Sequence, residues 1–147
     1  MPYDRGMSLI RIVLPATPLA VRETLSRLFD PPDGVDLPEA LHSKAQIVLA
    51  EVLNNIVEHA YATYAGDIDL CCEFDDKGLN VLITDRGLPL PLSGLPAGND
   101  PMEDPGDDLP EGGFGWFLIR TLAEDLNYDR TEGSNRLRFR VVPDTIA

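Results

Sequence analysis

A long apolar stripe in the middle of this 147-residue chain constrains the fold more than any other feature. Its members are Leu41, Ala45, Val48, Val52 and Ile56. Steps of four and three residues place these side chains on one face of an α-helix. The pattern predicts one long helix over residues 38–61, and such a helix needs a second apolar layer to cover its stripe.

Short apolar runs separated by turn residues supply that second layer. Five of them are expected to form β-strands: residues 8–14, 67–74, 79–84, 126–131 and 135–142. Residues 75–78 make the turn of a hairpin. Thr17 and Pro18 are typical of an N-cap and a first helical residue, so a helix is expected to begin there. A third helix is expected over residues 114–126. The order of elements predicts an α+β fold, a two-layer sandwich with helices on one face of a mostly antiparallel sheet.

Length and charge limit the functions open to such a domain. We expect residues 1–147 to form a single domain. A net charge of −13 opposes binding to nucleic acid and to anionic membranes, because both need clustered Lys and Arg. The first residues contain no long apolar run, so we expect a cytoplasmic protein. The adjacent Cys71 and Cys72 point to opposite sides of a strand and are expected to be unpaired thiols.

Residues 86–112 lack any periodic pattern and are crowded with proline, glycine and acidic side chains. Structureless loops of this length are uncommon inside a compact domain, and many of them are functional lids. The acidic residues of this predicted lid are Asp100, Glu103, Asp104, Asp107, Asp108 and Glu111. Their charge would repel an anionic ligand unless basic groups of a partner offset it.

The predicted central helix carries the first candidate site. Glu51 and Asn55 are four residues apart and therefore share one helical face. The carbonyl oxygen of Asn55 is a suitable ligand for Mg²⁺ beside nucleotide phosphates. Glu51 can orient or deprotonate a hydroxyl or a water molecule. Taken alone, the pair is better explained as part of a solvated helix face.

The second candidate is the end of the strand over residues 79–84. An apolar run leads directly into Asp85, and Gly87 follows two residues later. A carboxylate there can accept a hydrogen bond from an exocyclic amine such as that of adenine, while a glycine lets the backbone approach a flat ring. The alternative is an ordinary turn at the end of a strand.

Three glycines before the third predicted helix form the last candidate. Gly112, Gly113 and Gly115 let backbone N–H groups approach an anion at a helix N-terminus. The segment is not a Walker motif, because no Gly-Lys-Ser/Thr follows. It is not a Rossmann fingerprint either, because a long polar loop precedes it in place of a strand.

In this order the three motifs resemble those of the Bergerat-fold (GHKL) ATPases, the superfamily of gyrase, histidine kinases and mismatch-repair ATPases. Within it the chain is most similar to the anti-sigma factor serine kinases. The likeness rests on the sequence EVLNNIVEHAY over residues 51–61 and on Gly-Gly-Phe-Gly followed by Phe-Leu-Ile over residues 112–119. It extends from about Ser8 to Val142.

The resemblance implies ATP and Mg²⁺ as cofactors. Asn55 would ligate Mg²⁺, and Glu51 would be the general base. Asp85 would bind the adenine amino group, and Gly87 would line the adenine ring.

The phosphates would lie against the backbone of Gly112, Gly113, Phe114 and Gly115. Asn135 stands near the adenine, where the family usually has a threonine. The implied partners are an anti-sigma-factor antagonist of the STAS type and a sigma factor, and a homodimer is expected.

These features lead to two hypotheses of function. The first is an ATP-dependent serine/threonine kinase that phosphorylates the antagonist and so regulates the sigma factor. The alternative is an ATP-binding module of weak catalytic power that sequesters its partner, and the acidic predicted lid and Pro89 favour it. A structural protein without any nucleotide would require all three motifs to be coincidental.

Overall fold

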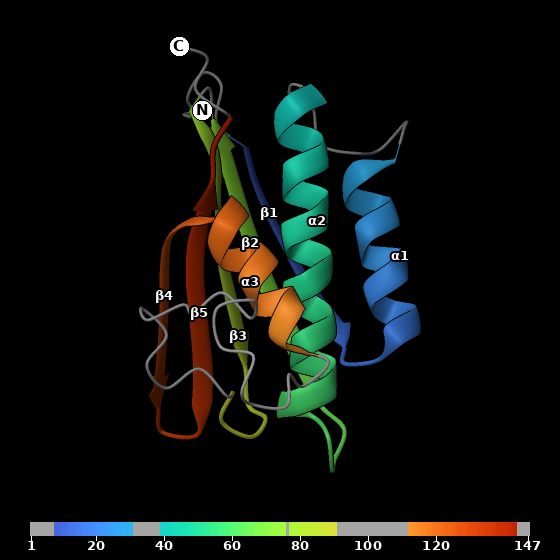
Figure 1. Cartoon of the computed structure of the whole chain (residues 1–147). Coiled ribbons are helices and arrows are strands. Elements are labelled where there is room, and N and C mark those ends of the chain that lie inside the picture. Colours follow the sequence, from blue (N-terminus) through green and yellow to red (C-terminus); the bar gives the residue numbers. More distant parts are fainter. Residues whose placement is uncertain (1–7, 31–38, 76, 91–111, 144–147) are drawn as a thin grey trace.

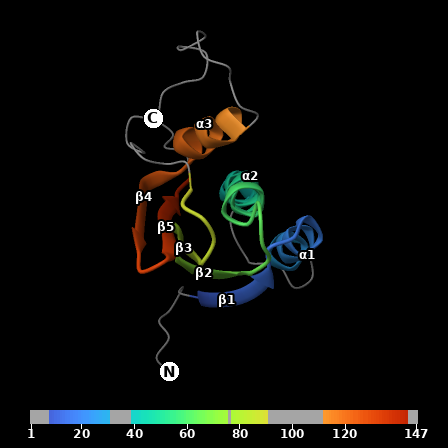
Figure 2. The ribbon, with the colours of Figure 1, turned by 90° about the horizontal axis from the view of Figure 1, so that it is seen from below.

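The protein forms two layers, a five-stranded sheet and three α-helices that cover one of its faces (Figures 1 and 2). This computed structural model describes residues 8–30, 39–75, 77–90 and 112–143. The strands are β1 (Ser8–Pro15), β2 (Asp67–Asp75), β3 (Gly78–Asp85), β4 (Glu124–Thr131) and β5 (Ser134–Val141). The helices are α1 (Pro18–Phe29), α2 (Glu39–Asn55) and α3 (Gly112–Leu122), and a π-helix, η1 (Ile56–Ala60), continues α2. The expected α+β sandwich is confirmed.

The sheet has the order β1-β2-β3-β5-β4, and each neighbouring pair is antiparallel. Residues directly opposite each other in such pairs project to the same face. One row near the end of the sheet contains Leu14, Ile68, Asp85, Asn135 and Arg130. Four of these five side chains are buried, so the row faces the helices. The strand order therefore brings polar residues from β3, β5 and β4 side by side.

The helices form where local sequence favours them and bury the stripe that the spacing predicts. The Thr17 hydroxyl accepts a hydrogen bond from Ala20 N at 3.1 Å, which caps α1 as expected. All five stripe residues of α2 and η1 are buried against the sheet and the neighbouring helices. The prediction of one long amphipathic helix is confirmed, with its last turn widened into η1.

The bounds predicted for the third helix were wrong at both ends. Gly112 begins α3, so the glycines lie in its first turn and not before it. The helix ends at Leu122, and Glu124 already pairs with Arg140 in the sheet. Asp125 adopts a left-handed conformation with φ of 55°, which an α-helix does not accommodate. The apolar Leu126 had suggested a helical pattern, but it packs on the core from a strand.

The two cysteines are unpaired, as expected, and face opposite sides of β2. Burial raises the pKa of the Cys72 thiol to about 12, which makes it unreactive at neutral pH. Within the described residues, no helix is both long and apolar enough to cross a membrane.

Candidate functional site

Asp85 ends β3 with its carboxylate buried on the helix-facing side of the sheet, where 3% of the residue is exposed. Gly87 N and Asn135 Nδ2 each donate to Oδ1 at 2.8 Å. Burial raises the pKa of Asp85, while these two hydrogen bonds and the charge of Arg130 act in the opposite direction. Both hydrogen bonds from described residues end on Oδ1, so Oδ2 keeps its capacity to accept from a ligand.

Gly87 lies directly against the end of the helix that carries Asn55. A Cβ atom at this position would lie 2.3 Å from the carbonyl oxygen of Ala60, the last residue of η1. Leu88 N donates to the same oxygen at 2.7 Å. Only glycine permits so close an approach, and the contact joins two of the predicted motifs.

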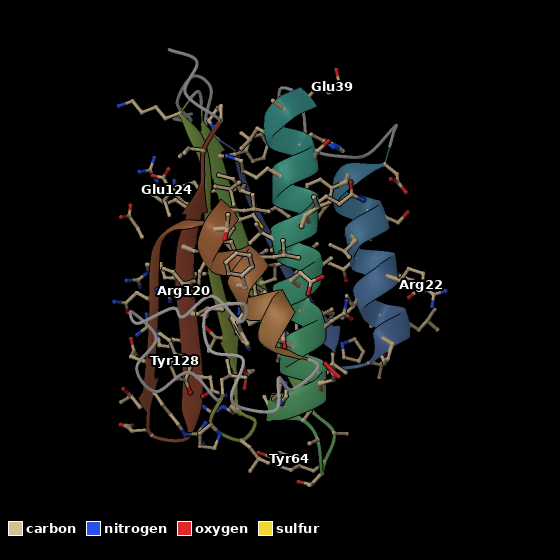
Figure 3. All side chains as sticks on the ribbon, in the orientation of Figure 1. Arg22, Glu39, Tyr64, Arg120, Glu124 and Tyr128 are labelled. Atoms are coloured by element: carbon tan, nitrogen blue, oxygen red, sulfur yellow. The ribbon has the colours of Figure 1, made fainter. Side chains whose placement is uncertain are left out.

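Two tyrosines hold the backbone between Asp85 and Gly87. The hydroxyl of Tyr61 donates to Asp67 O at 2.7 Å and accepts from Arg86 N at 3.0 Å. The hydroxyl of Tyr64, labelled in Figure 3, donates to Arg86 O at 3.0 Å. Burial raises the pKa of Tyr61, so its hydroxyl stays protonated and can donate. The segment after β3 is therefore fixed before any ligand binds.

Asn55 is buried at the end of α2 and has an unusual side-chain environment. Its Nδ2 donates to Glu51 O at 2.7 Å, which leaves Oδ1 pointing away from that carbonyl. Oδ1 is buried and has no hydrogen-bond partner among the described residues. Buried polar atoms nearly always have a partner, so an unpaired carbonyl oxygen fits the role of a metal ligand. Glu51 lies one turn earlier and is half-buried.

The described residues contain no cluster of three His, Cys, Asp or Glu side chains able to hold a metal ion. A metal at Asn55 would therefore need further oxygen ligands from elsewhere. Phosphate oxygens are such ligands for Mg²⁺, which protein sites often hold through one or two side chains only. The donor set fits a metal that arrives together with a nucleotide.

Asn135 lies opposite Asp85 in the register of β3 and β5 and is 1% exposed. Besides Asp85, its Nδ2 reaches Leu88 O at 2.8 Å. Its Oδ1 accepts from Arg130 Nη1 at 2.9 Å and from the hydroxyl of Tyr128. Every hydrogen-bonding position of the Asn135 amide is therefore used.

Sequence reasoning missed Tyr128 and Arg130. The available signal in the sequence was Gly133 between the two strands. In the structure Glu132 and Gly133 have φ values of 49° and 80°, which match a two-residue hairpin. Such a turn pairs Thr131 with Ser134 and hence Arg130 with Asn135.

The glycine motif lies at the start of α3, which packs against α2 (Figure 1). Gly112, Gly113, Phe114 and Gly115 form the first turn of this helix. Backbone N–H groups of a first turn have no partners within their helix and suit an anion. Residues 91–111, which hold the acidic side chains of the predicted lid, lie outside the described residues.

A hollow of about 420 Å³ lies on the opposite face of the sheet. Its lining includes Glu73, Leu82, Arg138 and Arg140, which alternate with the buried residues of their strands. It is therefore separated by the sheet from the cluster around Asp85.

Comparison with known proteins identifies the family. Residues 14–141 match the histidine kinase-like ATPase domain. The chain belongs to this family. Serine-protein kinase RsbW of Bacillus mycoides (strain KBAB4) and of Bacillus cereus (strain G9842) are each 30% identical to it over 99 residues. The same protein of Bacillus anthracis is 29% identical. The match covers 66% of this chain and 62% of each of these relatives.

Membership in the histidine kinase-like ATPase family implies that ATP is the nucleotide bound. The structure brings the Asp85–Gly87 segment, Asn135 and the end of the Asn55 helix together at one end of this ATPase domain. The roles of the individual residues remain predictions.

Proposed function

We propose that the protein is an ATP- and Mg²⁺-dependent serine/threonine kinase of the anti-sigma factor type. It acts in the cytoplasm, phosphorylates a STAS-type antagonist protein and thereby regulates a sigma factor. The names of the relatives, serine-protein kinases, support the reaction type. The unpaired, buried Oδ1 of Asn55, one turn after Glu51, is the observation that carries the proposal.

In this proposal residues 1–147 form one domain, residues 86–112 form its lid, and two copies associate. The base of ATP binds at the end of β3. Oδ2 of Asp85 accepts a hydrogen bond from the adenine amino group, and Gly87 lets the backbone lie close to the adenine ring. Asn135 holds the other carboxylate oxygen at 2.8 Å, so the carboxylate keeps one orientation.

The phosphates lie at the start of α3, on the backbone N–H groups of Gly112, Gly113, Phe114 and Gly115. Asn55 holds Mg²⁺ through Oδ1. When bound, Mg²⁺ supplies positive charge that stabilises the phosphate oxygens during transfer. Glu51 accepts the proton of the attacking serine or threonine hydroxyl. The rest of the catalysis is positioning by elements that are already packed.

The test combines the purified protein, labelled ATP with Mg²⁺, and the candidate antagonist protein. We expect labelled phosphoserine or phosphothreonine on the antagonist. Glu51→Gln should reduce transfer about 100-fold or more, because general bases contribute on the order of 10²–10⁴-fold, and should leave ADP binding unchanged. Glu58→Gln, on the exposed side of η1, is the matched control and should behave as the wild type. Intact ATP binding without any phosphoprotein would refute the kinase function.

The second candidate is a module that sequesters its partner and uses ATP only as a conformational ligand. The dense negative charge between residues 100 and 111 favours it, because like charges weaken phosphate binding. Pro89 is the second feature that favours it. Glu51→Gln separates the two functions. Regulation that survives this change, with no transfer detected in the wild type, supports the module and not the kinase.

A further inference from the structure

The side-chain amide of Asn135 can occupy its site in two orientations that differ by a 180° turn. In the structure the NH₂ group faces two acceptors, Asp85 Oδ1 and Leu88 O, both at 2.8 Å. The carbonyl oxygen faces two donors on β4, Tyr128 OH and Arg130 Nη1. Turning the amide would set its oxygen against the carboxylate and its NH₂ group against the guanidinium. The two donors on β4 therefore determine which end of the amide faces Asp85.

Tyr128 and Arg130 also reach the backbone after β3. The hydroxyl of Tyr128, labelled on β4 in Figure 3, accepts from Leu90 N at 3.0 Å and donates its own proton to Asn135 Oδ1. Arg130 Nη1 donates to Gly87 O at 2.9 Å as well as to Asn135. Both residues thus connect an edge strand to the segment that lines the candidate adenine site.

The orientation of Asn135 decides what Asp85 can offer a ligand. With the NH₂ group on Oδ1, the ionised form of the carboxylate is favoured, and this form presents Oδ2 as a pure acceptor. An acceptor matches the amino group of adenine and opposes the carbonyl oxygen that inosine carries at the same ring position. With the amide turned, its oxygen would face Oδ1, and the repulsion between the two oxygens would turn the carboxylate away from the orientation in which Oδ2 meets the adenine amino group.

We propose that Tyr128 and Arg130 are positioning residues that hold the Asn135 amide in one orientation and thereby make the Asp85 site selective for adenine. The inference rests on the proposed position of the base at Asp85. Neither residue needs to touch the nucleotide, since both act through Asn135. This role depends on the strand order, because Tyr128 and Arg130 are on a different strand from Asp85 and meet it only across β5.

The test measures binding of ADP and of inosine diphosphate by calorimetry, which requires no phosphoryl transfer. The wild type should prefer ADP. In the double variant Tyr128→Phe with Arg130→Met, the ratio of the two affinities should fall about 10-fold or more, since two hydrogen bonds, one of them charged, then no longer fix the amide. Tyr128→Phe alone should lower the ratio to a smaller extent and serves if the double variant does not fold.

One control variant matches these changes. Arg136→Met removes the same charge next to Asn135 but from the opposite face of β5. It should keep the wild-type ratio. A folded double variant with an unchanged ratio, or a control that shifts it equally, overturns the proposal. Binding of neither nucleotide by the wild type overturns the proposed function as well.

Discussion

Replacing Gly87 with alanine tests whether the segment after β3 must lie against the end of η1. The added Cβ would lie 2.3 Å from the carbonyl oxygen of Ala60, 2.6 Å from its carbonyl carbon and 2.7 Å from its Cβ. Two of these three atoms belong to the backbone of a packed helix and cannot rotate away. The segment that carries Gly87 must therefore move, and η1 with it to a smaller extent.

The cost has two parts that can be estimated separately. Overpacking of a well-packed site costs about 1–3 kcal/mol. Movement of the segment also breaks the hydrogen bond from Leu88 N to Ala60 O, which is 2.7 Å long and worth about 0.5–1.5 kcal/mol. We expect the free energy of unfolding to fall by about 2–4 kcal/mol. Nucleotide affinity should fall too, because Gly87 N no longer holds Asp85 Oδ1 in place.

Urea unfolding followed by circular dichroism measures the stability, and calorimetry with ADP measures the affinity. Gly133→Ala is the control, because φ at Gly133 is 80° and no described atom lies within 4 Å of an added Cβ. Its cost should be only the strain of a left-handed alanine, about 1 kcal/mol, with ADP affinity unchanged. If Gly87→Ala loses no more stability than this control and binds ADP normally, the argument from close approach is wrong.

Two further predictions concern residues around the same segment. Tyr61→Phe leaves Asp67 O and Arg86 N without their partner and should lower the free energy of unfolding in urea by about 1–3 kcal/mol; a loss below about 0.5 kcal/mol would contradict the anchoring role of this hydroxyl. Because burial raises the pKa of Asp85 in the folded state, its contribution to stability is complete below the unfolded pKa of about 3.9 and is lost as pH rises through the folded pKa. Without nucleotide, the wild type should therefore lose stability relative to Asp85→Asn as pH rises above about 4. A difference between the two proteins that does not change with pH would contradict the stated effect of burial.

Much of the architecture was predictable because it depends on near neighbours in the chain. The stripe that begins at Leu41 needs only the helical repeat, and Thr17 caps α1 through an atom three residues away. The hairpin of β2 and β3 follows from a short turn between two apolar runs. Asp85 and Asn55 were recognised as candidate site residues from motifs of the same local kind.

The end of α3 shows where such reasoning fails. Leu126 continues the helical spacing of the preceding residues, so periodicity extends the helix past Leu122. In the fold, Glu124 pairs with Arg140 on β5, and the chain turns into the sheet before the pattern ends. A pairing partner distant in sequence overrides the local preference, and no local pattern reports it.

The sequence by itself determined which segments form helices and strands, apart from the boundary between α3 and β4. It also determined that the three motifs belong to a nucleotide-binding domain and which carboxylate and amide are candidates for its chemistry. Only the tertiary structure decided that β5 lies between β3 and β4. That strand order, a matter of long-range register, joins the buried Asp85 and Asn135 and the exposed Arg130 in one row. The contact of Gly87 with Ala60 has the same origin, because it depends on how a strand end packs against a helix end.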